Sequence, residues 1–215
     1  MRQKEDLRRA ALSANRWSGV RMLETAHQLN ERSFALLAEA AKLETPSIEC
    51  NAVHGLQELW ARVDARACER AGSCPVLLLD LNFQRPAWWN NVHRGELEGG
   101  RVSQSCALFT HEQATPVLRE ILMEAWSVGR SMPSAANLLF GMAPSVSEAI
   151  ASLSVAEVDR VVANHARCLR PRWEESRPFW RQLLEAVLGT GNEALANIHL
   201  HCLQLVGTGL MPSSG

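Results

Sequence analysis

The chain has 215 residues, of which 47% are hydrophobic and 21% are charged, and its formal net charge at pH 7 is −1. This composition is typical of a folded protein and excludes a chain that is disordered throughout. The balanced charge also excludes a surface that attracts polyanions as a whole, so a nucleic-acid role would need a local basic patch or a basic partner.

The N-terminus, MRQKEDLRRAAL, is charged and no apolar segment of a signal peptide follows it. No run approaches the roughly 18 apolar residues of a membrane span. The six cysteines form no C-x-x-C pair, so a structural metal is not expected. Scattered cysteines without a secretory signal indicate a reducing compartment. We therefore expect a cytoplasmic protein without contact to a membrane and without a cofactor.

The first part of the chain is predicted to be helical. Residues 3–43 carry apolar side chains at helical spacing, as one helix or as two that meet at Ser18-Gly19, and a second helix is predicted over 51–71 with Gly72 at its end. The apolar run PVLLLDLNF (75–83) predicts one short buried strand or an extended segment. A short helix is predicted to begin near Pro86, and a polar loop from Gly99-Gly100 to about residue 114 is the expected boundary.

The rest of the chain is predicted to fold into further helices. They are expected from Thr115 to Trp126, after Pro133, after Ser145, after the capping box Ser154–Glu157, from Pro178, and over about 192–206. The predicted fold class is therefore mostly α and multi-helical, with one short strand at most near 75–83. It has an N-terminal helical region (1–112), a C-terminal helical module (113–207) and a disordered tail (208–215).

Residues for catalysis are hard to assemble from the sequence. It contains no P-loop, no G-x-G-x-x-G and no H-E-x-x-H. His199 and His201 are two residues apart, which on a helix places them on different faces and makes a poor pair for one metal ion. Asp80 follows an apolar run as an acid at a strand end would, but no βαβ pattern accompanies it. An enzyme is thus the third hypothesis, after two that involve no catalysis.

The stretch NHARCLRPRWEESRPFW (164–180) combines basic and aromatic residues, and Arg181 follows it directly. Arginine side chains contact phosphates and stack on bases, and tryptophan supports either contact. The alternative is that Trp173 and Trp180 belong to the core while the arginines pair with nearby glutamates. Two readings also apply to Trp88-Trp89: both rings are partly buried, or one of them anchors a contact with another molecule.

Several elements of the C-terminal half follow one another in the order found in a known family. LREILMEAWSVGRSMPSAANLLFGMAP contains Ala136, Leu139 and Gly141, and Leu153-Ser154, Arg172-Trp173-Glu174 and Ile198-His199 come after it. In this order and spacing the segment 118–205 resembles the FlhD family of flagellar transcriptional activators.

The resemblance implies a helical dimer that joins an FlhC-type partner and activates transcription from promoter DNA, the partner carrying zinc and much of the DNA contact. Under this hypothesis, one set of side chains supplies phosphate contacts or salt bridges to the partner, with Trp173 bracing the loop and His199 near the same face. The set is Arg167, Arg170, Arg172, Arg177 and Arg181.

The sequence also departs from the family. The family's cysteine, which can link two subunits, corresponds to Leu169, with Cys168 beside it, and residues 1–112 have no counterpart. The regulated operon is therefore open, flagellar or other. The alternative function is a helical accessory or scaffold protein of a secretion system or another multiprotein apparatus, with no DNA binding.

Overall fold

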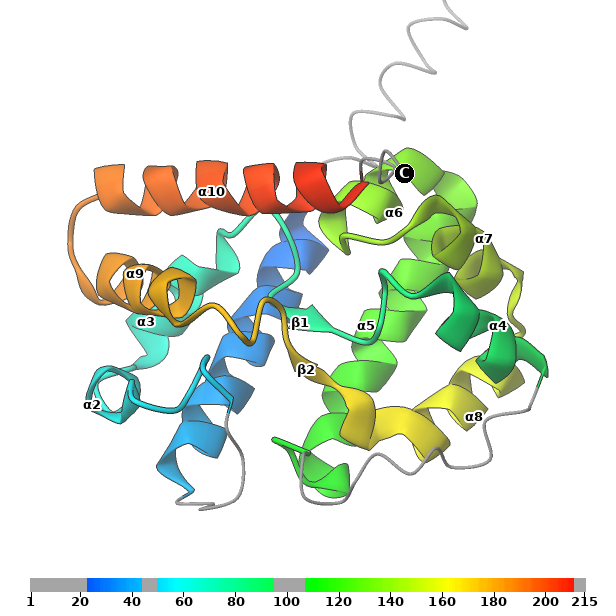
Figure 1. Cartoon of the computed structure of the whole chain (residues 1–215), viewed down its shortest axis with the longest axis horizontal. Helices are drawn as coiled ribbons and strands as arrows, with labels where there is room; N and C mark the ends of the chain where they lie inside the picture. Colours follow the sequence, from blue (N-terminus) through cyan, green and yellow to red (C-terminus); the bar gives the residue numbers. More distant parts are fainter. Residues whose placement is uncertain (1–22, 44–49, 95–106, 211–215) are drawn as a thin grey trace, which may run out of the picture.

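Helices make up most of the described chain, which comprises residues 23–43, 50–94 and 107–210 of a computed structural model, so the predicted mostly α fold class is confirmed. A helix over 23–42 comes first (Figure 1). The elements after it are α2 (Gln57–Trp60), α3 (Ala65–Gly72), β1 (Leu79–Asp80), α4 (Pro86–Arg94), α5 (His111–Ser131), α6 (Pro133–Leu139), α7 (Pro144–Ser152), α8 (Val155–His165), the 3₁₀-helix η2 (Ala166–Cys168), β2 (Arg170–Pro171), α9 (Arg177–Leu188) and α10 (Glu193–Leu210).

Several helices begin where a local signal in the sequence predicted their first residue. The capping box before α8 forms fully, since the Ser154 side chain accepts from the Glu157 backbone and the Glu157 side chain accepts from the Ser154 backbone. Proline occupies the first turn of α6 and of α9, where its missing N–H group costs nothing. The helix predicted after Pro86 is also present.

Two predicted helices differ from the structure. The helix expected over 51–71 is interrupted, because the Asp64 side chain accepts a hydrogen bond from the Ala67 backbone at 2.8 Å and caps a new helix, α3. Helix α5 begins before Thr115, because Thr110 forms a capping box with Gln113. The apolar run 75–83 contains the short strand β1 and is otherwise extended or turn-forming, which agrees with its prediction.

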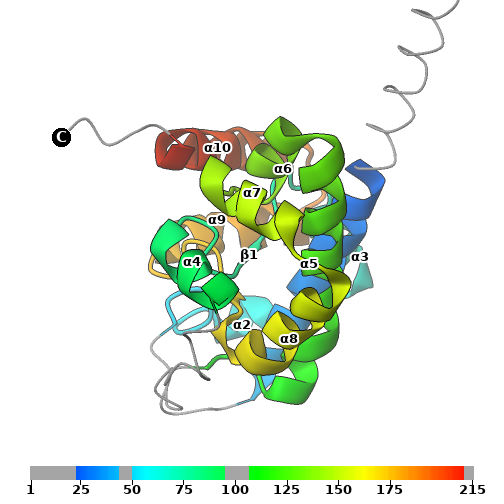
Figure 2. The same ribbon diagram turned by 90° about the vertical axis from the view of Figure 1, so that its right-hand side faces the viewer.

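The two halves of the sequence meet in this small sheet. β1 pairs with β2 in antiparallel register, with Leu79 opposite Pro171 and Asp80 opposite Arg170. Helices of the first half also pack on helices of the second, α3 on α9 and α4 on α7. Figures 1 and 2 show α5 running through the molecule against α6, α7 and α8. In Figure 1, α9 lies on the other side of the sheet, and α10 packs on α9 and runs along the top of the molecule toward α6.

The regions predicted as 1–112 and 113–207 therefore share one hydrophobic core within the described residues. At the far end, α10 continues to Leu210, which places the first residues of the predicted tail in a helix, while 211–215 lie outside the described residues. Residues 3–22 of the predicted N-terminal helix lie outside them too, as do residues 99–106 of the predicted boundary loop. None of the helices described has both the length and the apolar character to cross a membrane.

A single buried asparagine joins the first helix to the segment that leads into β1. The Asn30 side chain is fully buried and donates to the carbonyl oxygens of Cys74 at 3.0 Å and Val76 at 2.9 Å. Its own oxygen accepts from the Leu78 backbone at 2.8 Å. Because this amide satisfies three backbone groups that are otherwise buried, it fixes the extended course of the chain before Asp80.

Candidate functional site

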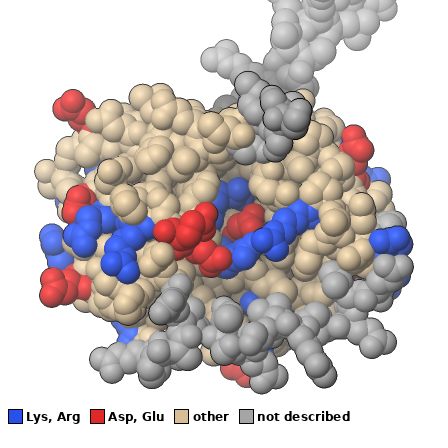
Figure 3. Space-filling model, viewed as in Figure 1, with Lys and Arg blue, Asp and Glu red and all other residues tan. Residues whose placement is uncertain are grey.

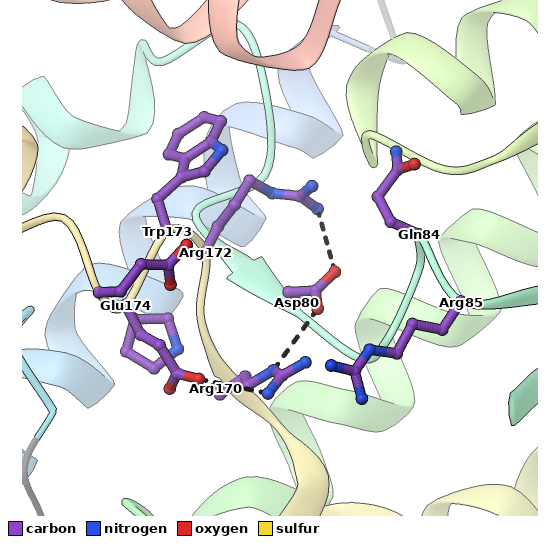
Figure 4. A pocket seen from close by; sticks show the side chains of 9 residues that line it. Asp80, Gln84, Arg85, Arg170, Arg172, Trp173 and Glu174 are labelled. Carbon is purple, nitrogen blue, oxygen red and sulfur yellow. Dashed lines mark hydrogen bonds and ion pairs between the residues drawn. The ribbon is translucent and has the colours of Figure 1, made fainter. Parts of the chain in front are cut away.

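A polar cavity of about 400 Å³ opens beside the β1–β2 pair. On the face shown in Figure 3, acidic and basic side chains form a band across the middle, with a hollow near its centre. We call this cavity the β1–β2 cavity. It is lined by Asp80, Gln84, Arg85, Arg170, Pro171, Arg172, Trp173, Glu174 and Glu175 (Figure 4).

Asp80 lies at the end of β1 and shapes the turn after it. Its carboxylate accepts from the backbone N–H of Asn82 at 3.0 Å and of Phe83 at 3.2 Å. Asn82 has a φ of 53°, in the left-handed region that asparagine tolerates better than most residues. The turn directs the chain toward Gln84 and Arg85, so the polar wall of the cavity follows from this local hydrogen bonding.

Arg172 forms the floor of the cavity and is 6% exposed. Its guanidinium group donates to the carbonyl oxygens of Leu77 at 2.8 Å, Phe140 at 2.5 Å and Leu79 at 3.4 Å, and lies 3.8 Å from the carboxylate of Asp80. Burial lowers the pKa of Arg172 from its ordinary value, and Asp80 opposes that shift. With these partners, Arg172 connects β1, β2 and the end of α6.

Arg170 is held at the side of the cavity by three different groups. Its guanidinium group donates to the Asn82 side chain at 2.8 Å and to Glu174 at 3.2 Å, and its Nε lies 3.7 Å from Asp80. Burial raises the pKa of Glu174, an effect that the positive charge of Arg170 partly offsets. Arg170 is therefore fixed in position before any ligand arrives.

Arg85 completes the cavity from the turn before α4. Within the part of the chain that the structure describes, the exposed Arg85 side chain has no hydrogen bond or ion pair. Figure 4 shows its guanidinium group pointing toward that of Arg170. Gln84 points the other way and donates to the Gly141 carbonyl at 2.5 Å. The sequence interpretation missed Arg85, although Asp80 and Asn82 mark a turn that ends an apolar run.

The tryptophans near the cavity belong mainly to the core, as one of the two readings expected. Trp180 is fully buried, and its indole N–H donates to the carbonyl oxygens of Arg172 and Trp173. Trp173 is partly buried and has a φ of 52°. Trp89 is buried, and Trp88, at its edge, is partly buried and faces His165.

The five arginines of the basic stretch do not form a single exposed edge. The prediction that Arg172 contacts DNA or a partner is wrong, because its guanidinium group is buried and donates to three carbonyl oxygens, so it cannot reach a DNA phosphate or a partner. Arg170 faces the cavity. Arg167 in η2 and Arg177 and Arg181 on α9 are exposed, and α8 and α9 lie on opposite sides of β2 in Figure 1.

The exposed arginines differ in their partners. Arg177 donates to the Asn51 side chain at 3.2 Å, and Arg181 lies 3.9 Å from Glu185 one turn along α9. Arg167 has no ion pair or hydrogen bond to any residue that the structure describes. Their predicted contacts with DNA or a partner stay predictions.

His199 lies on α10 and is half-buried, with its Nε2 atom 3.2 Å from the Ser73 hydroxyl and its pKa lowered by burial. His201 packs edge-on against Phe179. Across the described residues, no three histidine, cysteine or acidic side chains gather as metal ligands. At the position of the family's cysteine, Leu169 is buried in the core.

Helix α10 is apolar on two faces, and the rest of the described chain covers only one of them. The covered face consists of Leu195, Ile198, Cys202 and Val206. On the other face, Leu200 is 60% exposed and Leu203 is 37% exposed. Glu193 is the single charged residue of this helix. Figure 3 shows the surface over α10 almost free of charged side chains.

Comparison of the chain with known protein families, with curated proteins and with solved structures gives no match. The resemblance to the FlhD family thus depends on the residues of the segment 118–205 alone.

Proposed function

We propose that this protein is a regulatory subunit that works through protein–protein contact, as FlhD-type activators do. In this proposal two copies associate, an FlhC-type partner joins them, and the complex activates transcription from promoter DNA. The exposed apolar face of α10 is the observation that carries the proposal.

The exposed apolar side chains of α10 indicate a surface that another molecule buries. A helix that is apolar on all sides is normally enclosed by other elements, and an exposed apolar surface rimmed by polar residues marks an interaction site. On the open face of α10, Ala196, Leu200, Leu203 and Gly207 recur at helical spacing. This pattern suits a second helix packed along it, and small residues at 196 and 207 allow close approach.

The succession of short helices also supports the proposal. Gly141 of the family-like segment has a φ of 54°, the left-handed conformation that glycine adopts after a helix end. The pair Leu153-Ser154 separates α7 from α8, and Arg172-Trp173-Glu174 follows β2. These six residues therefore lie at turns and helix ends, where sequence and backbone are most closely linked, whereas Ile198-His199 lies within α10.

The direct role in DNA binding is the weaker part, and the structure favours a narrower version of it. Arg172 is buried and Arg170 is held by acidic groups, which leaves Arg167, Arg177 and Arg181 for phosphate contacts. These losses favour the alternative function, a scaffold protein of a multiprotein apparatus without DNA binding, in which α10 still provides the contact.

One set of variants tests the contact. We expect the wild-type chain to form dimers in light-scattering measurements and to co-purify with the product of a neighbouring FlhC-type gene. The double variant Leu200→Glu, Leu203→Glu should be monomeric and lose that partner, since four buried charges per dimer cannot be accommodated. Val155→Glu is the matched control, because Val155 is 46% exposed on α8. An unchanged dimer in the double variant would refute the role of α10.

A second measurement separates the two candidate functions. If the complex contacts phosphates through these arginines, then Arg167→Ala, Arg177→Ala and Arg181→Ala should each weaken binding to all DNA sequences. Each should also reduce the slope of log K against log salt by about 1. Unchanged slopes in a complex that still assembles would leave the scaffold function.

A further inference from the structure

We propose that the β1–β2 cavity binds a small monoanion with a carboxylate group, held between the guanidinium groups of Arg85 and Arg170. This goes beyond the proposed regulatory function and does not depend on it, because no described residue of α10 lines the cavity.

The guanidinium groups of Arg85 and Arg170 are arranged to share an anion. Arg85 and Arg170 point toward one another across the cavity (Figure 4), and Arg85 lacks an anionic partner among the described residues. Like charges that face each other repel, and an anion between them removes the repulsion. A carboxylate has two oxygens that accept hydrogen bonds from guanidinium groups, so one such group can bind to both cations.

The cavity is preorganised for a ligand. Arg170 is already fixed by Asp80, Asn82 and Glu174, so ligand binding need not order its side chain. Only Asn82 and Trp173, among the non-glycine residues described, have a positive φ, of 53° and 52°, and both lie next to Arg170 or the cavity. Backbone in this sparsely populated region concentrates at ligand sites, and here it positions the cavity wall.

The charge of the wall selects the class of ligand. Three arginines and three acids line the cavity, so its formal charge is zero: Arg85, Arg170 and Arg172 against Asp80, Glu174 and Glu175. Because the wall has no net positive charge, a dianionic phosphate would give the occupied cavity a formal charge of −2, whereas a monoanion leaves only −1 uncompensated. A cavity of about 400 Å³ is also in the size range of small-molecule sites and not of a macromolecular groove.

The test is a titration of the full chain, labelled with ¹⁵N, and it follows the indole N–H signal of Trp173, identified with a Trp173→Phe variant. Benzoate is the probe, benzamide is its neutral analogue, and inorganic phosphate is the competing anion, all at constant ionic strength. We expect saturable shifts with benzoate, with a dissociation constant on the order of 1 mM for so small a probe, and at least tenfold weaker binding of the other two.

The variant Arg85→Gln should bind benzoate at least tenfold more weakly, while Arg160→Gln, an exposed arginine on α8 outside the cavity, should bind as the wild type does. Both variants should keep the remaining spectrum, which shows that they are folded. No saturation with benzoate, equal binding of benzamide or phosphate, or unchanged binding by Arg85→Gln would each overturn the proposal. None of these outcomes affects the dimer test on α10.

Discussion

The guanidinium group of Arg172 lies directly against the backbone of Gly141, so that a β-carbon at position 141 would overlap its Nη1 atom. The two residues are neighbours because β2 brings Arg172 under the turn that ends α6. Gly141 also has a φ of 54°, and Gln84 binds its carbonyl oxygen. A glycine is thus required at this position for two separate reasons, backbone conformation and space.

Gly141→Ala should therefore lower the free energy of unfolding by about 2 to 4 kcal/mol, from left-handed strain together with displacement of Arg172. Urea denaturation measures it. Gly191→Ala is the control, since a β-carbon there has no neighbour within 4 Å, and it should change stability by less than about 0.5 kcal/mol. Equal stability of both variants would contradict the tight contact with Arg172.

Replacement of Arg172 itself should be costly even when the charge is kept. In Arg172→Lys the single ammonium group cannot reach Leu77, Leu79 and Phe140 together, so buried carbonyl oxygens lose their donors. We expect a loss of more than about 2 kcal/mol in the same assay. Arg181→Lys on the exposed face of α9 should cost less than about 0.5 kcal/mol. An Arg172→Lys variant with the stability of the wild type would show that this arginine has no structural role.

Asn30→Asp replaces the side-chain NH2 group by an oxygen and should destabilise the fold strongly. The carboxyl group loses the two hydrogen bonds donated to Cys74 and Val76, and a charge in this position would be fully buried. The expected loss is about 3 kcal/mol or more at pH 7. Asn164→Asp, at an exposed position of α8, should cost no more than about 1 kcal/mol. Similar urea midpoints of unfolding for the two variants would disprove the bridging role of Asn30.

Acid should destabilise the protein in part through His165. Burial lowers the pKa of His165 in the folded state below its ordinary value of 6.5, so the unfolded chain binds a proton more readily. Stability should then be constant above about pH 7.5 and fall as the pH drops through 6.5 toward the lower folded pKa. His199, whose pKa is lowered for the same reason, contributes with the same sign.

The variant His165→Phe keeps an aromatic ring beside Trp88, and its free energy of unfolding should fall less than that of the wild type between pH 7.5 and pH 5. Denaturation series at both pH values provide the comparison, with His54→Gln, at an exposed position, as the control for loss of a histidine. Parallel pH profiles for His165→Phe and the wild type would remove His165 as a cause.

Much of the helical framework was predictable because its signals are local. Ser154 and Glu157 cap α8 from within four residues, and Pro133 and Pro178 lie in the first turns of their helices. Two helix boundaries were predicted wrongly because a less conspicuous capping residue lies near a more conspicuous pattern. Asp64 caps a new helix within a stretch whose apolar spacing is helical throughout, and Thr110 starts α5 ahead of Pro116.

The candidate site was only partly predictable. Arg170 and Arg172 were selected from the sequence for contacts with DNA or a partner and Trp173 for bracing the loop, but the cavity also needs Arg85, which is distant in the chain. Periodicity identified the apolar run before Asp80 without showing what it would pair with. The β1–β2 pairing that assembles the site joins residues about ninety positions apart, and no local pattern encodes such a contact.

Local signals in the chain are enough to establish the mostly helical class and the places where α4, α6, α8 and α9 begin, because caps and prolines act over one turn of chain. The environment of each arginine in the basic stretch depends instead on tertiary packing. Arg167 remains exposed, Arg170 lines the side of a cavity and Arg172 is buried at the floor of that cavity. Burial and ion pairing depend on which distant segments pack together, and neighbouring residues of one type therefore end in different environments.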